Sequence, residues 1–197
     1  MNNTDICNMA LSYIGSGKIA SLDDDNENAR TCKIHYDHQR ELTLRNYTWG
    51  FANKKVKLAQ VDDEVLGWEY IYAYPAQCLA LRAIYNKEGA DVKDWEKDSY
   101  EIVLGNNNVR YICCDVPEAW AECTYDINDA EKFSVDFCEA LARGLASAIA
   151  LPLTGNMSLQ SANYQLWQIA VANAKVSNAK EQHKDTHYPS KYFDARS

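Results

Sequence analysis

The chain contains few residues that break regular structure, and it has no long hydrophobic run. Its 197 residues include only 4 Pro and 8 Gly, which excludes collagen-like and low-complexity proteins. The longest apolar run covers residues 148–153 and contains Pro152, far short of the ~20 residues that span a bilayer. The N-terminus carries Asp5 and no basic segment, unlike a secretory signal peptide. We therefore expect a globular protein that does not enter a membrane.

Positive charge is also scarce. The chain has 20 Lys and Arg against 28 Asp and Glu, a formal net charge of −8. Such a surface repels phosphate, which argues against a protein that binds duplex DNA tightly. The seven cysteines are an odd number in apolar surroundings, a pattern typical of reduced, buried thiols in a protein made in the cytoplasm.

The first 49 residues predict two helices. Thr4 is expected to cap the first helix, and Gly15 follows its end. The acidic run at residues 23–27 marks the start of the second helix, where negative charge favours the helix dipole. For this second helix, the spacing predicts a buried face formed by Ala29, Cys32, Tyr36 and Leu44 and an outer face carrying Arg30, Lys33, Arg40 and Arg45.

A period of two residues replaces the helical period after Trp49. Apolar and polar residues alternate over residues 54–60 and again over 68–74, which predicts strands. The second of these strands places a row of aromatics on one face, namely Trp68, Tyr70, Tyr72 and Tyr74. Residues 78–85, 100–104 and 109–113 continue the β character.

The helical period returns near residue 129. Ser134 is expected to cap a helix that ends at Pro152 and Gly155. A last helix over about residues 158–182 has an apolar stripe, which we expect to pack against the other helices. The stripe consists of Leu159, Ala162, Leu166, Ile169 and Val176.

Together these patterns predict an α+β fold. We expect an antiparallel helical bundle made of residues 1–49 and 129–183, with a β-rich domain at 50–128 inserted between them. Residues 184–197 have no apolar period and are expected to form an extended C-terminal arm.

The sequence has no complete motif for a metal, a cofactor or a catalytic nucleophile. The stretch from Gly15 to Lys18 lacks the first glycine and the Ser or Thr of a phosphate loop. Cys32, His35 and His38 are spaced so that one helix cannot direct all three toward one ion. We therefore expect no cofactor, no metal and no enzymatic activity.

Two alternative functions remain open. Glu118 and Glu122 are candidates for the acid and base of a cell-wall or polysaccharide hydrolase, which requires two carboxylates about 5 to 9.5 Å apart. The aromatic row at residues 68–74 is a candidate surface on which a single-stranded nucleic acid would stack, although aromatic rows of this kind more commonly form a sheet core or a subunit interface.

Several short motifs occur in a characteristic order between residues 4 and 155. The stretch Trp49-Gly50-Phe51-Ala52 follows Thr48, where proline is usual. The strand pair at residues 68–79 contains Trp68, Tyr74-Pro75 and Cys78-Leu79. The remaining motifs are Ile6-Cys7-Asn8-Met9-Ala10-Leu11, Ile14-Gly15, Ile19, Ser21-Leu22-Asp23, Ala29, Cys32, Tyr36-Asp37, Arg40-Glu41, Leu44-Arg45, Tyr111-Ile112, Phe133, Phe137, Ala140-Leu141-Ala142 and Leu145-Ala146.

In this order and spacing the motifs resemble the tail tubular protein A family, the head-to-tail adaptors of short-tailed phages. The resemblance implies a structural virion protein, assembled in the host cytoplasm, that forms a twelve-fold ring between the portal protein and the tail nozzle protein. It also implies that the ring surrounds the channel through which DNA leaves, without reading its sequence.

The resemblance gives two sets of candidate site residues. It implies that the arm docks on the portal, with Tyr188, Pro189, Tyr192 and Phe193 as its anchors. A channel wall should be acidic, because each Lys or Arg would add a contact to a phosphate and slow the DNA. We therefore expect Asp62, Asp63 and Glu64 to face the channel.

Overall fold

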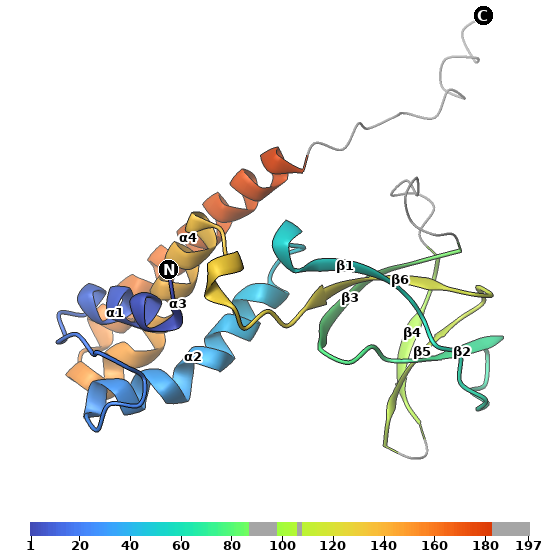
Figure 1. The fold of residues 1–197 in the computed structure, drawn as a ribbon, viewed down its shortest axis with the longest axis horizontal. Coiled ribbons are helices and arrows are strands. Elements are labelled where there is room, and N and C mark those ends of the chain that lie inside the picture. The colour runs from blue at the N-terminus through green and yellow to red at the C-terminus, as the bar shows by residue number, and fades with distance from the viewer. Residues whose placement is uncertain (87–97, 106–107, 183–197) are drawn as a thin grey trace, which may run out of the picture.

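The protein is of mixed α and β structure. The computed structural model describes residues 1–86, 98–105 and 108–182, and within them it has four α-helices and two antiparallel sheets of three strands each. In Figure 1 the helices occupy one end of the molecule and the strands the other. The helices are α1 (Asn3–Tyr13), α2 (Glu27–Arg45), α3 (Val135–Thr154) and α4 (Met157–Glu181).

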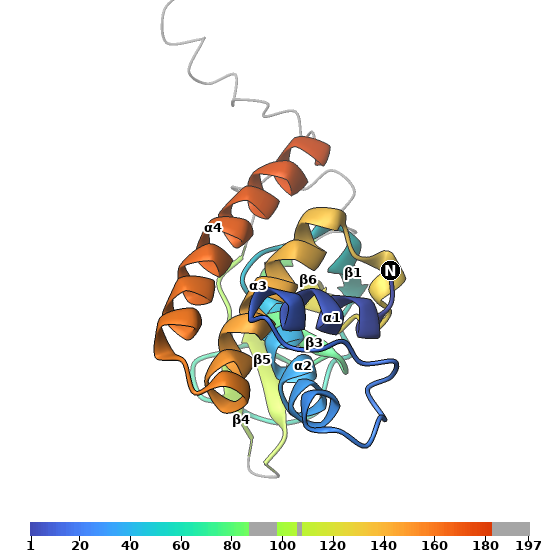
Figure 2. The same ribbon diagram turned by 90° about the vertical axis from the view of Figure 1, so that its left-hand side faces the viewer.

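Helix α3 is the centre of the helical part. It packs against α1, α2 and α4, with α4 on one side and α1 on the other (Figure 2). Gly144 permits this close approach, because a Cβ there would lie 2.2 Å from Gln39 Nε2 and 3.0 Å from Trp167 Cδ1. By length and hydropathy α3 is the one described helix that could cross a membrane, and most of it is buried inside the protein, as in a core helix.

Each helix begins at a residue whose side chain caps its first turn. Asn2, and not the expected Thr4, caps α1: its side chain accepts the Asp5 N–H at 2.9 Å, and the Asp5 carboxylate accepts the Asn2 N–H at 2.8 Å. This reciprocal pair satisfies two backbone donors that the helix leaves unpaired. The predicted Ser134 cap of α3 is confirmed.

The predicted end of α3 at Pro152 and Gly155 is confirmed at Gly155, which takes a left-handed conformation with φ of 66° just after Thr154. Pro152 itself lies inside the helix, exposed and in its last turn. A proline there interrupts the hydrogen bonds of the helix only a few residues before its end.

Helix α2 confirms the predicted inner face and corrects the outer one. Ala29, Cys32, Tyr36 and Leu44 are all buried. Arg40, expected outside, is only 2% exposed, because its guanidinium turns toward the end of the β region.

The apolar stripe of α4 faces solvent, contrary to expectation. Leu166, Ile169 and Val176 are 42%, 57% and 55% exposed. The face that packs on α3 carries instead the buried residues Asn163, Val171, Ala174 and Asn178. The period of the sequence correctly indicated a helix. The buried face of this helix, however, is not the one that carries the apolar stripe.

The β region consists of two sheets. One has the strand order β1 (Asn53–Lys57), β6 (Trp120–Tyr125), β3 (Cys78–Tyr85), and the other β2 (Tyr70–Ala73), β5 (Arg110–Cys114), β4 (Glu101–Leu104). Buried residues from both sheets, including Tyr72 and Ile112 from one and Ile84 and Cys123 from the other, form one apolar cluster. The two sheets therefore share a core that is separate from the core of the helices.

Strand β6 was absent from the expected strands. It is the central strand of its sheet, and four of its six residues are buried. Residues 121–125 do alternate, with Ala121, Cys123 and Tyr125 at the apolar cluster, so the pattern typical of a strand was present and was overlooked.

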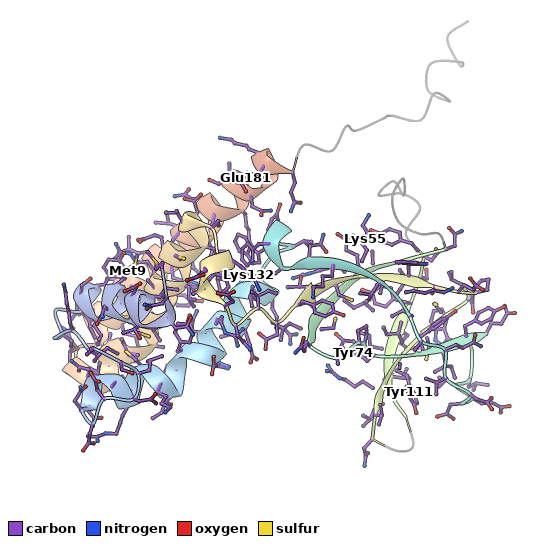
Figure 3. All side chains as sticks on the ribbon, viewed as in Figure 1. Met9, Lys55, Tyr74, Tyr111, Lys132 and Glu181 are labelled. Carbon is purple, nitrogen blue, oxygen red and sulfur yellow. The ribbon has the colours of Figure 1, made fainter. Side chains whose placement is uncertain are left out.

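Two arginines attach the β region to α2. Arg40 of α2 pairs with Asp126, which follows β6, and donates to the Ile127 carbonyl at 3.0 Å. Arg82 of β3 donates to the carbonyls of Arg45 and Tyr47, each at 2.9 Å, and so binds the carbonyl end of α2. Figure 3 shows the two groups of side chains meeting there, with Met9 among the helices, Tyr74 and Tyr111 among the strands, and Lys132 close to the junction.

We predict that Arg40→Met lowers the free energy of unfolding by about 3 kcal/mol, because it leaves the Asp126 carboxylate without its buried partner. Arg30→Met is the matched control on the same helix: its ion pairs with Asp25 and Glu27 are exposed and contribute less than about 1 kcal/mol. Urea denaturation of both variants measures the difference. Equal losses would show that the Arg40 contact does not hold the β region to α2.

Candidate functional site

The residues expected to line a channel lie in the connection between β1 and β2. Asp62, Asp63 and Glu64 are all exposed. The base of this connection is fixed to β2, since the Val61 N–H donates to the Ile71 carbonyl and the Ala73 N–H donates to the Ala59 carbonyl, each at 2.8 Å. The loop is at the end of the β region farthest from the helices (Figure 1).

Asp62 and Asp63, but not Glu64, border a shallow, open hollow of about 400 Å³. Its lining is Gln60, Val61, Asp62, Asp63, Glu69 and Ile71. In the part of the chain that the structure describes, no Lys or Arg lies within ion-pair distance of Asp62, Asp63 or Glu64. No group of His, Cys, Asp and Glu among these described residues is arranged to hold a metal ion. The hollow is therefore a negatively charged surface that repels phosphate.

Glu118 and Glu122, the carboxylates of the hydrolase alternative, contact different partners. Glu118 is exposed at a turn before β6 and pairs with Lys57 at 3.0 Å. Glu122 is 5% exposed and accepts hydrogen bonds from Asn53 Nδ2 at 2.7 Å and from the Tyr85 hydroxyl. Nothing in these contacts favours the shared role that glycoside cleavage requires.

The aromatic row does not form one open surface. Tyr72 is 1% exposed, and its hydroxyl donates to the Val116 carbonyl at 2.6 Å and accepts the Ala119 N–H at 3.3 Å. Trp68 belongs to a different apolar cluster and donates to Glu101 at 3.0 Å. Tyr74 packs under the Arg110 guanidinium, whose centre is 4.3 Å from the ring centroid. The row serves the sheet core, which leaves no continuous platform for stacked bases.

All seven cysteines are free and buried, as the sequence predicts. Burial raises the pKa of the Cys113, Cys114 and Cys138 thiols, because the charged thiolate loses its solvation. Cys32 is fully buried and His38 is exposed, so the string of Cys32, His35 and His38 does not converge.

The other candidate site residues, Tyr188, Pro189, Tyr192 and Phe193, lie outside the described residues. The hypothesis that they dock on a portal therefore remains a prediction.

Sequence reasoning missed the polar groups that are buried between elements. Arg40 and Arg82 join α2 to the β region, and the Asn178 side chain accepts the Gly50 N–H at 3.0 Å, which ties the end of α4 to the 3₁₀ turn η1 (Gly50–Ala52). The one signal for Arg40 was its helical spacing from the buried Tyr36 and Leu44. Asn178 gave no such signal.

No protein-family model and no curated protein matches this chain. The resemblance to the tail tubular protein A family therefore depends on the motifs quoted above.

We predict that Tyr72→Phe costs about 1–2 kcal/mol of stability, because the Val116 carbonyl and the Ala119 N–H both lose a buried partner. Tyr70→Phe is the matched control, since Tyr70 is only partly buried in the same strand, and we expect a change below about 0.5 kcal/mol. Urea denaturation monitored by circular dichroism measures both values. A Tyr72→Phe protein as stable as the wild type would contradict the buried role of this hydroxyl.

Proposed function

We propose that the chain is a structural virion protein, a head-to-tail adaptor that forms a ring between a portal and a tail nozzle. One observation carries the proposal: the whole β region lies in the chain between α2 and α3, which pack against each other. This is the element order expected of the family that the motifs resemble.

We interpret the fold as a helical bundle with an inserted β domain. The helices enclose one apolar core and the two sheets enclose another. The contacts between them include the hydrogen bonds of Arg40 and Arg82 and the packing of Leu79 of β3 against the helical core. Two bodies joined in this way suit an adaptor, which must present different surfaces to a partner on each side.

The acidic loop fits the wall of a channel for DNA. Asp62, Asp63 and Glu64 are exposed without a cationic partner among the described residues, so their charge is not neutralised. Negative charge keeps the phosphates of a passing duplex in the solvent and adds no attractive contact. We assign these three residues to the channel side of the ring.

The adaptor needs no catalytic group, metal or cofactor. Its partners are the portal protein, the tail nozzle protein and further copies of itself, in a ring of twelve on the portal. A ring uses two different faces of each subunit, and obligate contacts of this kind commonly bury about 2,000–5,000 Å².

The assembly test uses the purified 22.3 kDa chain and the portal protein encoded by the same virus. Light scattering of the mixture is expected to show a portal carrying twelve added copies, about 270 kDa more than the portal alone. Cryo-electron microscopy of this complex should place residues 62–64 on the inner wall. Failure of the chain to bind the portal, or an outward-facing acidic loop on a ring with a basic lumen, would overturn the corresponding part of the proposal.

A second experiment tests the arm. We expect replacement of Tyr188, Tyr192 and Phe193 by alanine to weaken portal binding by at least about tenfold, because aromatic anchors contribute most of the energy of an interface. The matched control replaces Thr186 and Ser190 of the same segment by alanine. Portal pulldown measures both, and normal binding by a chain that lacks residues 184–197 would reject this role for the arm.

A further inference from the structure

Helix α4 has two faces of different composition. The face on α3 carries the buried Asn163, Val171, Ala174 and Asn178. The opposite face is exposed, although it contains the larger aliphatic residues of this helix. Among the residues that the structure describes, the outer face is therefore not needed for packing.

The exposed residues follow a seven-residue repeat. Ala162, Ile169 and Val176 are spaced by seven, and Leu159, Leu166 and Asn173 form a parallel row three positions before them. We call these six residues the α4 stripe. This is the alternating three- and four-residue spacing by which one helix packs against another. The α4 stripe is exposed except for the half-buried Leu159.

The α4 stripe is also free of charge. No Asp, Glu, Lys, Arg or His stands between Arg143 and Lys175. Other exposed surfaces would repel a copy of themselves: β1 carries Lys54, Lys55 and Lys57, and the acidic loop carries three carboxylates. Against the α4 stripe, a second identical helix meets no like charge.

We propose that the α4 stripe binds the α4 stripe of a second copy of this chain, in an antiparallel pair. Residues 159–180 of the helix are about 32 Å long at 1.5 Å per residue, and self-pairing matches this length completely. In a parallel pair Lys180 would oppose its own copy, whereas in an antiparallel pair it faces the uncharged start of the other helix. The two-fold axis then passes close to Ile169.

This contact goes beyond the proposed ring. A two-fold pair uses the same face of both subunits, whereas a ring uses two different faces. We therefore expect the pair to form in the free protein, before assembly, where it covers the exposed apolar stripe. In this proposal the ring contacts lie on other surfaces.

The first experiment measures the mass of the purified full-length chain at about 100 μM by light scattering, where a weak specific pair is populated. We expect about 45 kDa, twice the 22.3 kDa of the chain. Ile169→Glu should raise the dissociation constant at least about tenfold, because it places two carboxylates at the axis. Gln168→Glu is the matched control: it adds the same charge at an adjacent, exposed position beside the α4 stripe, and should leave the pair intact.

Both variants alter exposed side chains, so we expect the circular dichroism spectrum and the urea midpoint of each to match the wild type. A monomeric wild type at this concentration would overturn the inference, as would equal effects of the two variants. These outcomes are independent of portal binding, which tests the ring separately with the same variants.

A second experiment tests the antiparallel arrangement. All seven native cysteines are buried, so an added Cys at the axis reacts alone. Under mild oxidation, Ile169→Cys should form a disulfide-linked pair rapidly, whereas Val176→Cys should link only when mixed with Ala162→Cys. Equal self-linking of the Ile169 and Val176 variants would indicate a parallel pair and reject the proposed arrangement.

Discussion

The packing of α2 against α3 is the constraint on which the rest of the structure depends. These two helices are separated in the chain by the whole β region, and their contact buries residues such as Leu44 and Leu145 in one core. The chain must therefore leave the helices at the end of α2 and return to them before α3. The strands lie between these two points of the chain, and buried residues of both sheets form a second apolar cluster.

Hydrogen bonds of two arginines then join the helical part to the β region. Arg82 reaches from β3 to the last carbonyls of α2, and Arg40 reaches from α2 to the end of β6. The oxygen atoms that bind Arg82 come from the end of α2, and those that bind Arg40 come from the segment after β6. Each contact is therefore directional and costly to break. Burial lowers the pKa of Arg82, because the charged guanidinium loses part of its solvation. The same junction places the acidic loop at the far end of the molecule (Figure 1).

The exposed surfaces of the helical part and of the β region differ in charge, and the adaptor role that we propose would make use of this difference. The β region presents lysines along the edge strand β1 and carboxylates in its outer loop, and charged edges of this kind prevent unwanted strand pairing. The helical part presents the uncharged α4 stripe. A protein that joins larger bodies needs such chemically distinct faces, since each has to select a different partner. The buried Glu122 and the separately paired Glu118, by contrast, are held in structural contacts.

The sequence predicted most of the helices and strands but few of the contacts between them. The capping residue Ser134, the inner face of α2 at Ala29, Cys32, Tyr36 and Leu44, and the strands on either side of residue 75 follow from local spacing. The exposed, acidic character of residues 62–64 was also readable from their composition. The central strand β6 was missed although Ala121, Cys123 and Tyr125 alternate with Glu122 and Thr124, a period of two that is typical of a strand.

What the sequence determined by itself was the type and approximate position of most elements, because caps and periodicity act within a few residues of each other. Only the tertiary structure decided which face of α4 is buried, that Arg40 turns inward and that Tyr72 belongs to the core. Each of these depends on a surface supplied by another segment: α3 packs against α4, the Gly50 N–H meets Asn178, and Asp126 receives Arg40. The spacing of residues along one helix does not show which other segment will cover it. Burial depends on both surfaces in contact, so it could not be predicted from one of them.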